Sequence, residues 1–274
     1  MKNTVSPSNL SSKLTRGILL EKKFITRSII KMRIANEEIV DLIQPGQFIN
    51  IRVADSFSPL LRRPFSVFRV NKGENWFEIL FQIIGKGTQL LADTQIGAEV
   101  DLLGPLGNGF VIPKKLDFAV LVAGGLGIAP LLVLTQELKK TNIPTILFWG
   151  NRTKDAFTIV SDFEKLGVKV FLATDDGSFG FNGTVTELLN TTVENIKKST
   201  VEIFTCGPNP MLKTLKKISI NNNIPCQISL ETQMACGFGV CMGCNVTSKM
   251  DSEQYKYVCQ HGPVFDSWEI EPGD

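Results

Sequence analysis

The feature that most constrains this chain is a group of cysteines close to its C-terminus. Four of them follow the spacing C-x4-C-x2-C-x14-C, with glycines among the first three: Cys236, Cys241, Cys244 and Cys259. A plant-type [2Fe–2S] cluster takes three ligands from one tight loop at this spacing and a fourth from a separate segment. Glycines let such a loop turn sharply and bring backbone N–H groups close to the sulfur atoms. The spacing therefore favours a [2Fe–2S] site.

Other interpretations of the cysteines stay open. A structural zinc site also uses four cysteines, although zinc ribbons usually present two C-x2-C pairs and this segment has one. The four could also be ordinary reduced thiols, which their density among glycines disfavours. A chain of 274 residues without a signal peptide does not fit a disulfide scaffold. Outside the group, we expect Cys226 to be a small buried hydrophobic residue.

The sequence contains one histidine, His261, and this excludes several classes of site. Zinc hydrolase sites with several histidines need more than one, and Rieske clusters need two imidazoles. A Ser-His-Asp hydrolase would depend entirely on His261, which lies in a Gly/Pro turn shortly after a cysteine. We therefore expect no catalytic acid–base residue in this chain.

Charge and hydropathy narrow the choice of partners. The net charge is +2 and no block of Lys and Arg stands out, which argues against nucleic acid. No apolar run reaches the roughly 18 residues of a membrane-spanning helix. Residues 1–13 are polar and predict a loose tail rather than a secretory signal, so we expect a cytoplasmic protein.

Residues 14–112 predict a small antiparallel barrel. Short segments that alternate or run apolar are separated by Gly or Pro, with one brief helix at Thr88–Asp93. The predicted strands are Phe24–Ile34, Gln47–Val53, Phe65–Val70, Trp76–Ile84 and Glu99–Leu103.

Residues 113–230 predict a parallel sheet covered by helices, because apolar strands alternate with helical patterns. Two Gly/Pro turns follow predicted strands, Gly124–Pro130 and Cys206–Pro210. Such turns would meet at the carboxyl edge of the sheet, where a diphosphate can approach a helix N-terminus. Tight-turn packing is the alternative explanation for the first turn. The candidate dinucleotide residues are Gly125, Gly127, Cys206, Gly207 and Pro208. Residues 231–274 hold the cysteines and have too few apolar residues for a core of their own.

Two segments of the barrel suggest a second dinucleotide. Leu61–Val67 contains Arg63, Pro64, Phe65 and Ser66, and Gly85-Lys86-Gly87-Thr88 opens the short helix about twenty residues later. An arginine and a Gly/Thr helix start suit a diphosphate-containing cofactor such as FAD. A solvated arginine pair beside a turn is the alternative.

Together these motifs resemble the ferredoxin-NADP reductase superfamily, and more narrowly the electron-transfer subunit of NAD-dependent (type B) dihydroorotate dehydrogenase. The resemblance covers about Thr15 to Phe265 and includes M-A-C-G-F-G-V-C-M-G-C, the later C-x-x-G-P-V-F and the segment Thr174–Gly183. It implies that Arg63 to Ser66 contact FAD, that Leu80, Phe81 and Gln82 line it, and that Gly87 and Thr88 bind its diphosphate. It also implies NAD in the second domain.

The resemblance further implies a partner and a pathway. Dihydroorotate would be oxidised on an FMN-containing catalytic subunit, in a heterotetramer of two plus two chains within pyrimidine (UMP) biosynthesis. This chain would carry electrons through [2Fe–2S] and FAD to NAD+. A sulfide, hydrogenase or glutamate synthase type of partner stays open, because function in this fold lies in the partner. A zinc-stabilised interaction module is the alternative from another class. Arg152 could meet the 2′-phosphate of NADP, or could simply be solvated.

Overall fold

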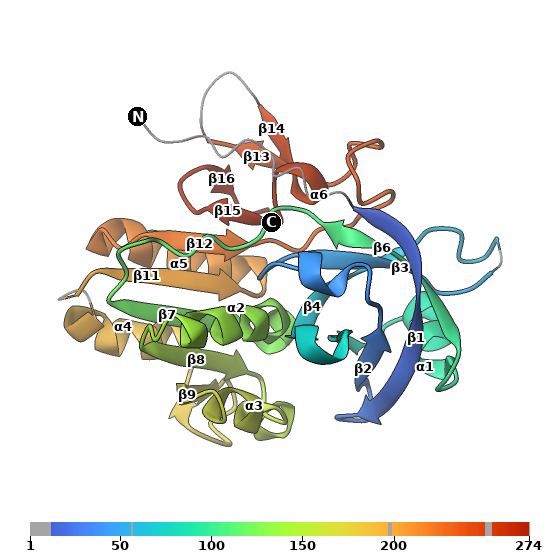
Figure 1. Ribbon diagram of the computed structural model, residues 1–274. Coiled ribbons are helices and arrows are strands. Elements are labelled where there is room, and N and C mark those ends of the chain that lie inside the picture. Colours follow the sequence, from blue (N-terminus) through green and yellow to red (C-terminus); the bar gives the residue numbers. More distant parts are fainter. Residues whose placement is uncertain (1–11, 56, 197–198, 250–253, 274) are drawn as a thin grey trace.

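The computed structural model describes residues 12–55, 57–196, 199–249 and 254–273, and these form three regions along the chain (Figure 1). Most of the tail expected at residues 1–13 lies outside the described residues, and Lys13 already begins the first strand. None of the described helices is both long and apolar enough to span a membrane.

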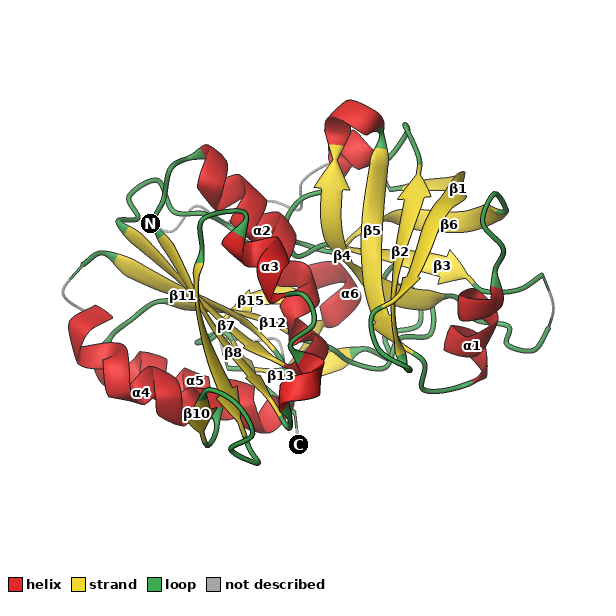
Figure 2. Ribbon diagram, turned by 90° about the horizontal axis from the view of Figure 1, so that it is seen from below, coloured by secondary structure: helices red, strands yellow, loops and turns green. Residues whose placement is uncertain are grey.

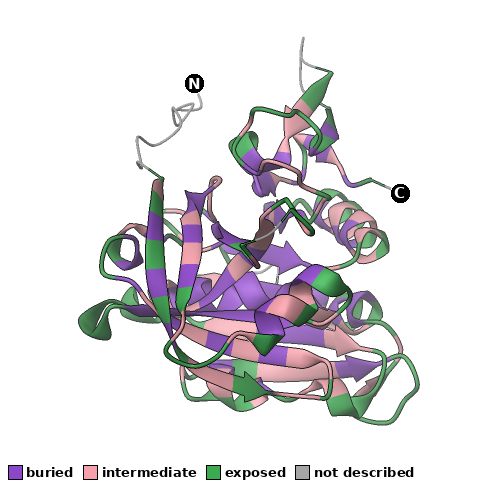
Figure 3. Ribbon diagram, turned by 90° about the vertical axis from the view of Figure 1, so that its right-hand side faces the viewer, coloured by how far each residue is buried: buried purple, intermediate pink, exposed green. Residues whose placement is uncertain are grey.

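The first region is a closed antiparallel barrel with the strand order β1-β2-β5-β4-β3-β6. Its strands are β1 (Lys13–Phe24), β2 (Ile29–Ala35), β3 (Phe48–Arg52), β4 (Arg63–Asn71), β5 (Trp76–Gln82) and β6 (Glu99–Leu106). Every second residue is buried from Thr15 to Leu19 of β1 and along the whole of β2, as the alternating bands of Figure 3 show. This period of two confirms the predicted antiparallel barrel. The helix α1 (Lys86–Asp93) closes one end and begins two residues before its predicted start.

The beginning of the barrel differs from the prediction. The sequence pattern predicts one strand over Phe24–Ile34, whereas the chain forms β1 and β2 with a turn between them. The hydroxyl of Thr26 accepts hydrogen bonds from the backbone N–H groups of Ser28 and Ile29 and stabilises that turn. The strand β1 shows no clear alternation of polar and apolar residues, because its exposed positions mix charged Arg16 with apolar Leu14 and Ile18.

The second region is a seven-stranded sheet with the order β10-β9-β8-β7-β11-β12-β15. Its strands are β7 (Phe118–Gly124), β8 (Thr145–Asn151), β9 (Lys169–Thr174), β10 (Phe181–Asn182), β11 (Val201–Cys206), β12 (Cys226–Ser229) and β15 (Val264–Asp266). All neighbouring pairs are parallel except β12 with β15. The predicted parallel sheet is therefore confirmed, and an antiparallel strand from the cysteine region extends its edge.

Helices cover both faces of this sheet (Figure 2). They are α2 (Ala129–Lys140), α3 (Val160–Glu164), α4 (Val185–Ile196) and α5 (Asn209–Asn222). On one face α2 and α3 pack on Leu121 and Leu147, and on the other α4 and α5 pack on Val120 and Val122. Burial on two faces explains why these strands are continuously apolar in the sequence.

The third region contains the cysteines and rests on both other regions. It has β13 (Asn245–Ser248), β14 (Tyr255–Tyr257), α6 (Val258–His261) and β16 (Ile270–Glu271), with β13 central in a three-stranded sheet. Its buried side chains, such as Val246 and Ile270, belong to the same core cluster as Phe48 of the barrel and Ile228 of the sheet. The region therefore has no separate core, as its composition predicts.

Candidate functional site

The strand β4 presents the flavin motif on two faces. Phe65 is buried in the barrel core with its ring centroid 5.1 Å from that of Phe81, whereas Pro64 and Ser66 are half-buried on the outer side. On β5, Leu80 and Gln82 face outward and line a cleft described below. The predicted residues with side chains on the outer face are Pro64, Ser66, Leu80 and Gln82. The side chains of Phe65 and Phe81 support this face from inside the barrel.

Arg63 lies against the first turn of α1. A Cβ atom at Gly87 would lie 2.9 Å from Arg63 Nε, so glycine lets the guanidinium approach the helix backbone closely. Thr88 Oγ1 accepts hydrogen bonds from the backbone N–H groups of Ile84 and Gly85 and donates to Gly85 O, which makes it a capping residue. The first-turn N–H groups of a helix have no intrahelical acceptors. Together with the cation they form a cradle that fits a diphosphate.

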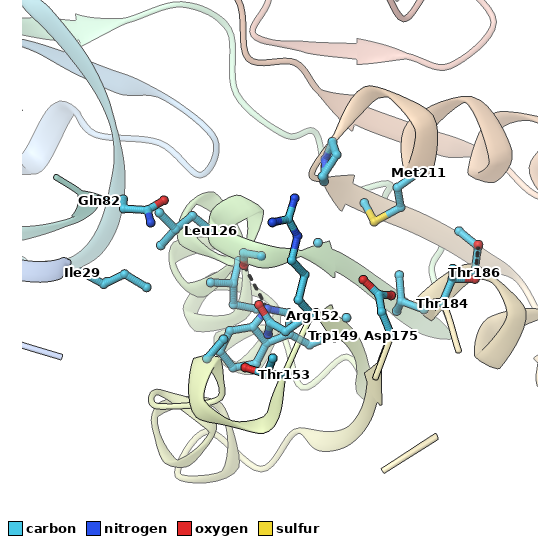
Figure 4. A pocket seen from close by; sticks show the side chains of 18 of the residues that line it. Ile29, Gln82, Leu126, Trp149, Arg152, Thr153, Asp175, Thr184, Thr186 and Met211 are labelled. Carbon is cyan, nitrogen blue, oxygen red and sulfur yellow. Dashed lines mark hydrogen bonds between the residues drawn. The ribbon is translucent and has the colours of Figure 1, made fainter. Parts of the chain in front are cut away.

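A cavity of about 670 Å³ lies between the barrel and the carboxyl ends of the parallel strands (Figure 4). Gly124, Gly125 and Leu126 line it after β7, and Pro208 and Met211 line it after β11. Its barrel wall includes Leu80 and Gln82, and further polar residues come from the ends of β8 and β9: Asn151, Arg152, Thr153 and Asp175. This is the edge at which open parallel sheets bind ligands. The cavity is large enough for part of a dinucleotide beside the outer face of the barrel.

The two predicted glycine turns pack against each other. A Cβ atom at Gly127 would overlap the carbonyl oxygen of Cys206, and one at Gly207 would overlap the side chain of Met211. Cys206 is fully buried, and burial raises the pKa of its thiol. Gly125 and Pro208 line the cavity, whereas Gly127, Cys206 and Gly207 lie behind it. The structure thus separates the five predicted residues into two that face the cavity and three that hold the turns together.

Several residues that line the cavity were absent from the sequence prediction. Trp149 donates its indole N–H to Gly125 O at 3.0 Å and fixes the first glycine turn. The side-chain Nδ2 of Asn151 is buried and has no hydrogen-bond partner in the part of the chain that the structure describes. An unpaired buried donor at the carboxyl edge of a parallel sheet fits a polar ligand. Asn151 is the last residue of β8, and Asp175 directly follows β9. A polar residue at the end of an apolar strand is the signal that could have identified both.

The four predicted cluster cysteines lie in two pairs. Cys241 N–H donates to Cys236 Sγ at 3.4 Å, while Cys244 Sγ lies 3.2 Å from Cys259 Sγ. Cys259 N–H also donates to Cys244 Sγ at 3.4 Å. Within the part of the chain that the structure describes, no three potential metal ligands converge on one point. The third region thus brings the four predicted ligands together as two pairs, one within the cysteine loop and one between this loop and α6.

The loop backbone favours thiolate at the first cysteine. Burial raises the pKa of Cys236, but the backbone N–H groups of Cys241, Phe238 and Val240 outweigh it and bring the value to about 6. At Cys259, burial and the neighbouring Cys244 raise the pKa to about 12. Iron binds the deprotonated sulfur, so metal binding displaces the proton at this second pair.

The donor set fits an iron–sulfur cluster. It consists of four thiols, and glycines at positive φ, Gly237 and Gly239, aim backbone N–H groups inward. The single histidine takes no part in this set. His261 Nδ1 accepts a hydrogen bond from Tyr257 N–H at 2.9 Å, and its ring stacks on that tyrosine. Cys226 is 1% exposed in the core of the second region, as expected.

Comparison with known families assigns a binding function to each region. Residues 231–271 match the model of the iron-sulfur cluster binding domain of dihydroorotate dehydrogenase B. Residues 121–217 match an oxidoreductase NAD-binding domain, and residues 16–110 match an oxidoreductase FAD-binding domain. The chain therefore has binding domains for an iron–sulfur cluster, FAD and NAD.

Curated relatives cover nearly the whole chain. A protein of Desulforamulus reducens named "Dihydroorotate dehydrogenase B (NAD(+)), electron transfer subunit" is 36% identical over 234 residues, which are 85% of this chain and 88% of the relative. A protein of the same name from Fusobacterium nucleatum is 36% identical over 249 residues, 90% of this chain and 94% of the relative. The similarity thus extends over all three regions.

Solved structures share the fold. A structure of an NADH-dependent reduced ferredoxin-NADP oxidoreductase has a TM-score of 0.82 at 28% identity and covers 93% of this chain and 90% of its own. A ferredoxin NADP+ reductase from Neisseria gonorrhoeae has a TM-score of 0.65 at 20% identity, with 77% of this chain and 92% of its own covered. The second comparison supports the arrangement of barrel and sheet alone.

Proposed function

Because this chain belongs to the family of electron transfer subunits of the NAD(+)-dependent dihydroorotate dehydrogenase B, we propose that it carries electrons from dihydroorotate, oxidised on an FMN-containing partner subunit, to NAD+. The complex would contain two copies of each subunit and act in the cytoplasm in pyrimidine biosynthesis. Bound FAD exchanges a hydride with nicotinamide and single electrons with an iron–sulfur centre. The residues of this chain bind and align the groups, and none needs to act as a general base.

One observation carries the proposal, namely the order of sites across the outer face of the barrel. Adjacent strands are paired in the order β6, β3, β4 and β5. The cysteine loop contacts β3 through Asn50, the flavin motif is on β4, and the cavity at the sheet edge uses Leu80 and Gln82 of β5. Neighbouring strands lie about 4.8 Å apart. Cluster, flavin and nicotinamide sites would therefore follow one another in the order that electron transfer requires.

Nicotinamide binding is proposed at the sheet edge, with NAD in preference to NADP. Arg152 and Asp175 both line the cavity after consecutive strands (Figure 4). A carboxylate at this edge can accept hydrogen bonds from a ribose and repels a 2′-phosphate. The preference is checked by steady-state kinetics, and comparable kcat/KM values for NADH and NADPH would contradict it.

The partner subunit is proposed to dock on the cysteine loop. Three apolar side chains of this loop are largely exposed: Phe238 at 52%, Val240 at 72% and Met242 at 57%. An apolar rim around a cluster near the surface gives a partner both contact area and a short electron path. The alternative is that these side chains fold back onto the chain, and their exposure disfavours it.

Reconstitution with the FMN subunit tests the whole proposal. The isolated chain, loaded with FAD and iron, should oxidise NADH with artificial acceptors but show no turnover of dihydroorotate. Addition of the FMN subunit should give dihydroorotate:NAD activity. Turnover of dihydroorotate by the single chain, or none by the complex, would contradict the proposal. The fold is shared with an NADH-dependent ferredoxin-NADP oxidoreductase, so a ferredoxin-type partner is the second candidate if the complex is inactive.

The docking surface has a matched test. Phe238→Asp should weaken the complex with the FMN subunit and leave the FAD spectrum unchanged. Phe24→Asp is the control, because Phe24 is 57% exposed at the other end of β1 from the third region (Figure 1). Equal complex formation by both variants would place the interface elsewhere.

A further inference from the structure

Two asparagine side chains connect the cysteine region to the barrel. Asn50 lies on β3, and Asn108 follows β6 in the connection to the sheet. Asn50 donates its side-chain amide to the backbone carbonyl of a predicted cluster ligand, and Asn108 donates to the carbonyls of the two residues after another. Since three ligands are in one loop and the fourth in another segment, each ligand segment has its own asparagine.

Asn50 holds the first ligand segment. Its Nδ2 donates to the carbonyl oxygen of Cys236 at 3.0 Å, and the side chain is 1% exposed. On β4 its Cα partner is Pro64 of the flavin motif, so Asn50 lies directly between that motif and the cysteine loop. A Cβ atom at Gly237 would overlap Asn50 Nδ2, which requires glycine at that position and shows how closely the loop approaches β3.

The other side-chain atom of Asn50 is unsatisfied. Within the described residues Oδ1 is buried without a hydrogen-bond partner, and the carbonyl of Cys236 fixes the amide orientation because only Nδ2 can donate to it. The bond to Cys236 is therefore the contact that sets the orientation of the Asn50 side chain.

Asn108 holds the second ligand segment. Its Nδ2 donates at 3.1 Å to the carbonyl oxygens of both Gln260 and His261, the two residues after Cys259. Its backbone N–H also donates to Gly262 O. A Cβ atom at Gly107 would lie against Pro263, so the two chains are in close contact here as well. Rotation of Cys259 relative to the barrel would break these bonds.

We propose that Asn50 and Asn108 are positioning residues that fix the distance and orientation of the cluster relative to the flavin. The inference rests on the proposed binding of both groups. Electron transfer between fixed centres falls steeply with separation, and a side chain that holds a ligand segment to the flavin-binding barrel sets that separation. Asn50 acts through the loop at Cys236, and Asn108 through the segment at Cys259.

The experiment compares Asn50→Ala and Asn108→Ala with Asn36→Ala. Asn36 is also buried in the barrel, but it binds the backbone of Arg16, Glu38 and Ile39 rather than a segment that carries a cluster ligand. Each variant is first assayed for FAD and iron per chain. After mixing with NADH, flavin absorbance and freeze-quenched EPR of the cluster then give the rate of transfer between them.

We expect Asn50→Ala and Asn108→Ala to keep FAD and iron but to slow transfer between flavin and cluster relative to the wild type, because the ligand segment is no longer held at a fixed separation from the barrel. The EPR signal of the reduced cluster should also change shape in Asn50→Ala. Ferricyanide reduction, which can draw electrons directly from the flavin, should stay at the wild-type rate. Asn36→Ala should lower the melting temperature without slowing transfer.

Three outcomes would overturn the inference. Wild-type transfer rates in both loaded variants would show that the asparagines do not set the geometry. An equal decrease in Asn36→Ala would assign the effect to general loosening of the barrel. Loss of iron from both variants would show that the two asparagines are needed to retain the cluster rather than to position it. A wild-type protein that binds no FAD or no iron would instead contradict the proposed function.

Discussion

At the scale of single residues, buried ionisable groups give the clearest expectations. Glu202 on β11 is 7% exposed and accepts a hydrogen bond from Gln227 Nε2 at 2.6 Å. The pKa of Glu202 is raised to about 7. Burial is the largest cause, Asp266 adds to it, and the hydrogen bond from Gln227 acts in the opposite direction. In the unfolded chain the carboxyl would titrate near its ordinary value of about 4.3.

The pH dependence of stability follows from this difference. Between about pH 4.5 and pH 7 the folded state holds more protons than the unfolded state, so Glu202 lowers the free energy of unfolding as the pH rises through this window. Well above pH 7 its penalty is constant, on the order of 3–4 kcal/mol. Glu202→Gln should therefore stabilise the protein at pH 8 and have little effect at pH 4.5, as measured by urea unfolding. A stabilisation independent of pH would exclude this explanation.

The cluster ligands give a second prediction at this scale. Cys241→Ser should abolish stable iron binding but leave flavin in place, since the cysteines and the flavin motif lie in different regions. Iron analysis and EPR check the first part, and the flavin spectrum checks the second. Cys226→Ser is the control, because Cys226 is fully buried in the sheet and should affect stability alone. Full iron occupancy in Cys241→Ser would reject the ligand assignment.

At the scale of elements, the helix α1 and the strand β4 form the diphosphate cradle together. Arg63→Ala should weaken FAD binding by roughly 1.5–3 kcal/mol, the range for a hydrogen bond to a charged group. Arg62→Ala is the control, because Arg62 is paired with Asp101 at 2.8 Å and belongs to a different contact. Flavin fluorescence on dilution measures both affinities. Equal losses of FAD affinity in the two variants would show that Arg63 is not part of the cradle. Release of FMN alone on denaturation would exclude FAD as the bound flavin.

The elements also show what the sequence can predict and why. The alternation of strands and helices in the second region was predicted from the sequence, because strands buried on both faces and amphipathic helices have distinct hydropathy patterns. The strand β1 was missed, since one of its faces is exposed and mixed in character. Asn50 and Asn108 were also missed. Their role depends on contacts across 186 and 152 positions of sequence, which no local pattern encodes.

At the scale of the whole molecule, one charged network joins the barrel to the sheet. Glu78, which is 1% exposed, forms ion pairs with Lys31, Arg33 and Arg69. Arg69 also pairs with Asp162 of α3, so a single guanidinium bridges the two regions. These side chains are mostly buried, which makes the bridge more effective than an exposed pair.

The ion pair between Arg69 and Asp162 is expected to affect both the stability of the protein and its binding of NADH. Asp162→Asn should lower the free energy of unfolding by about 1 kcal/mol and raise the KM for NADH, because the cavity lies between the regions that Arg69 joins. FAD and iron contents should stay unchanged. Glu137→Gln is the control, since the ion pair of Glu137 among the described residues is the local one with Lys140 on α2. An unchanged KM in Asp162→Asn would show that the bridge serves stability alone.

The antiparallel strand β15 has a consequence for biosynthesis. It covers the edge of β12, yet it is encoded more than thirty residues later and after all four cluster cysteines. While the chain leaves the ribosome, the hydrogen-bonding groups of β12 stay open until residues 264–266 emerge, and an open edge can pair with another nascent chain. A premature stop just before Val264 would keep all four cluster cysteines but leave the edge of β12 open, so it should yield inclusion bodies.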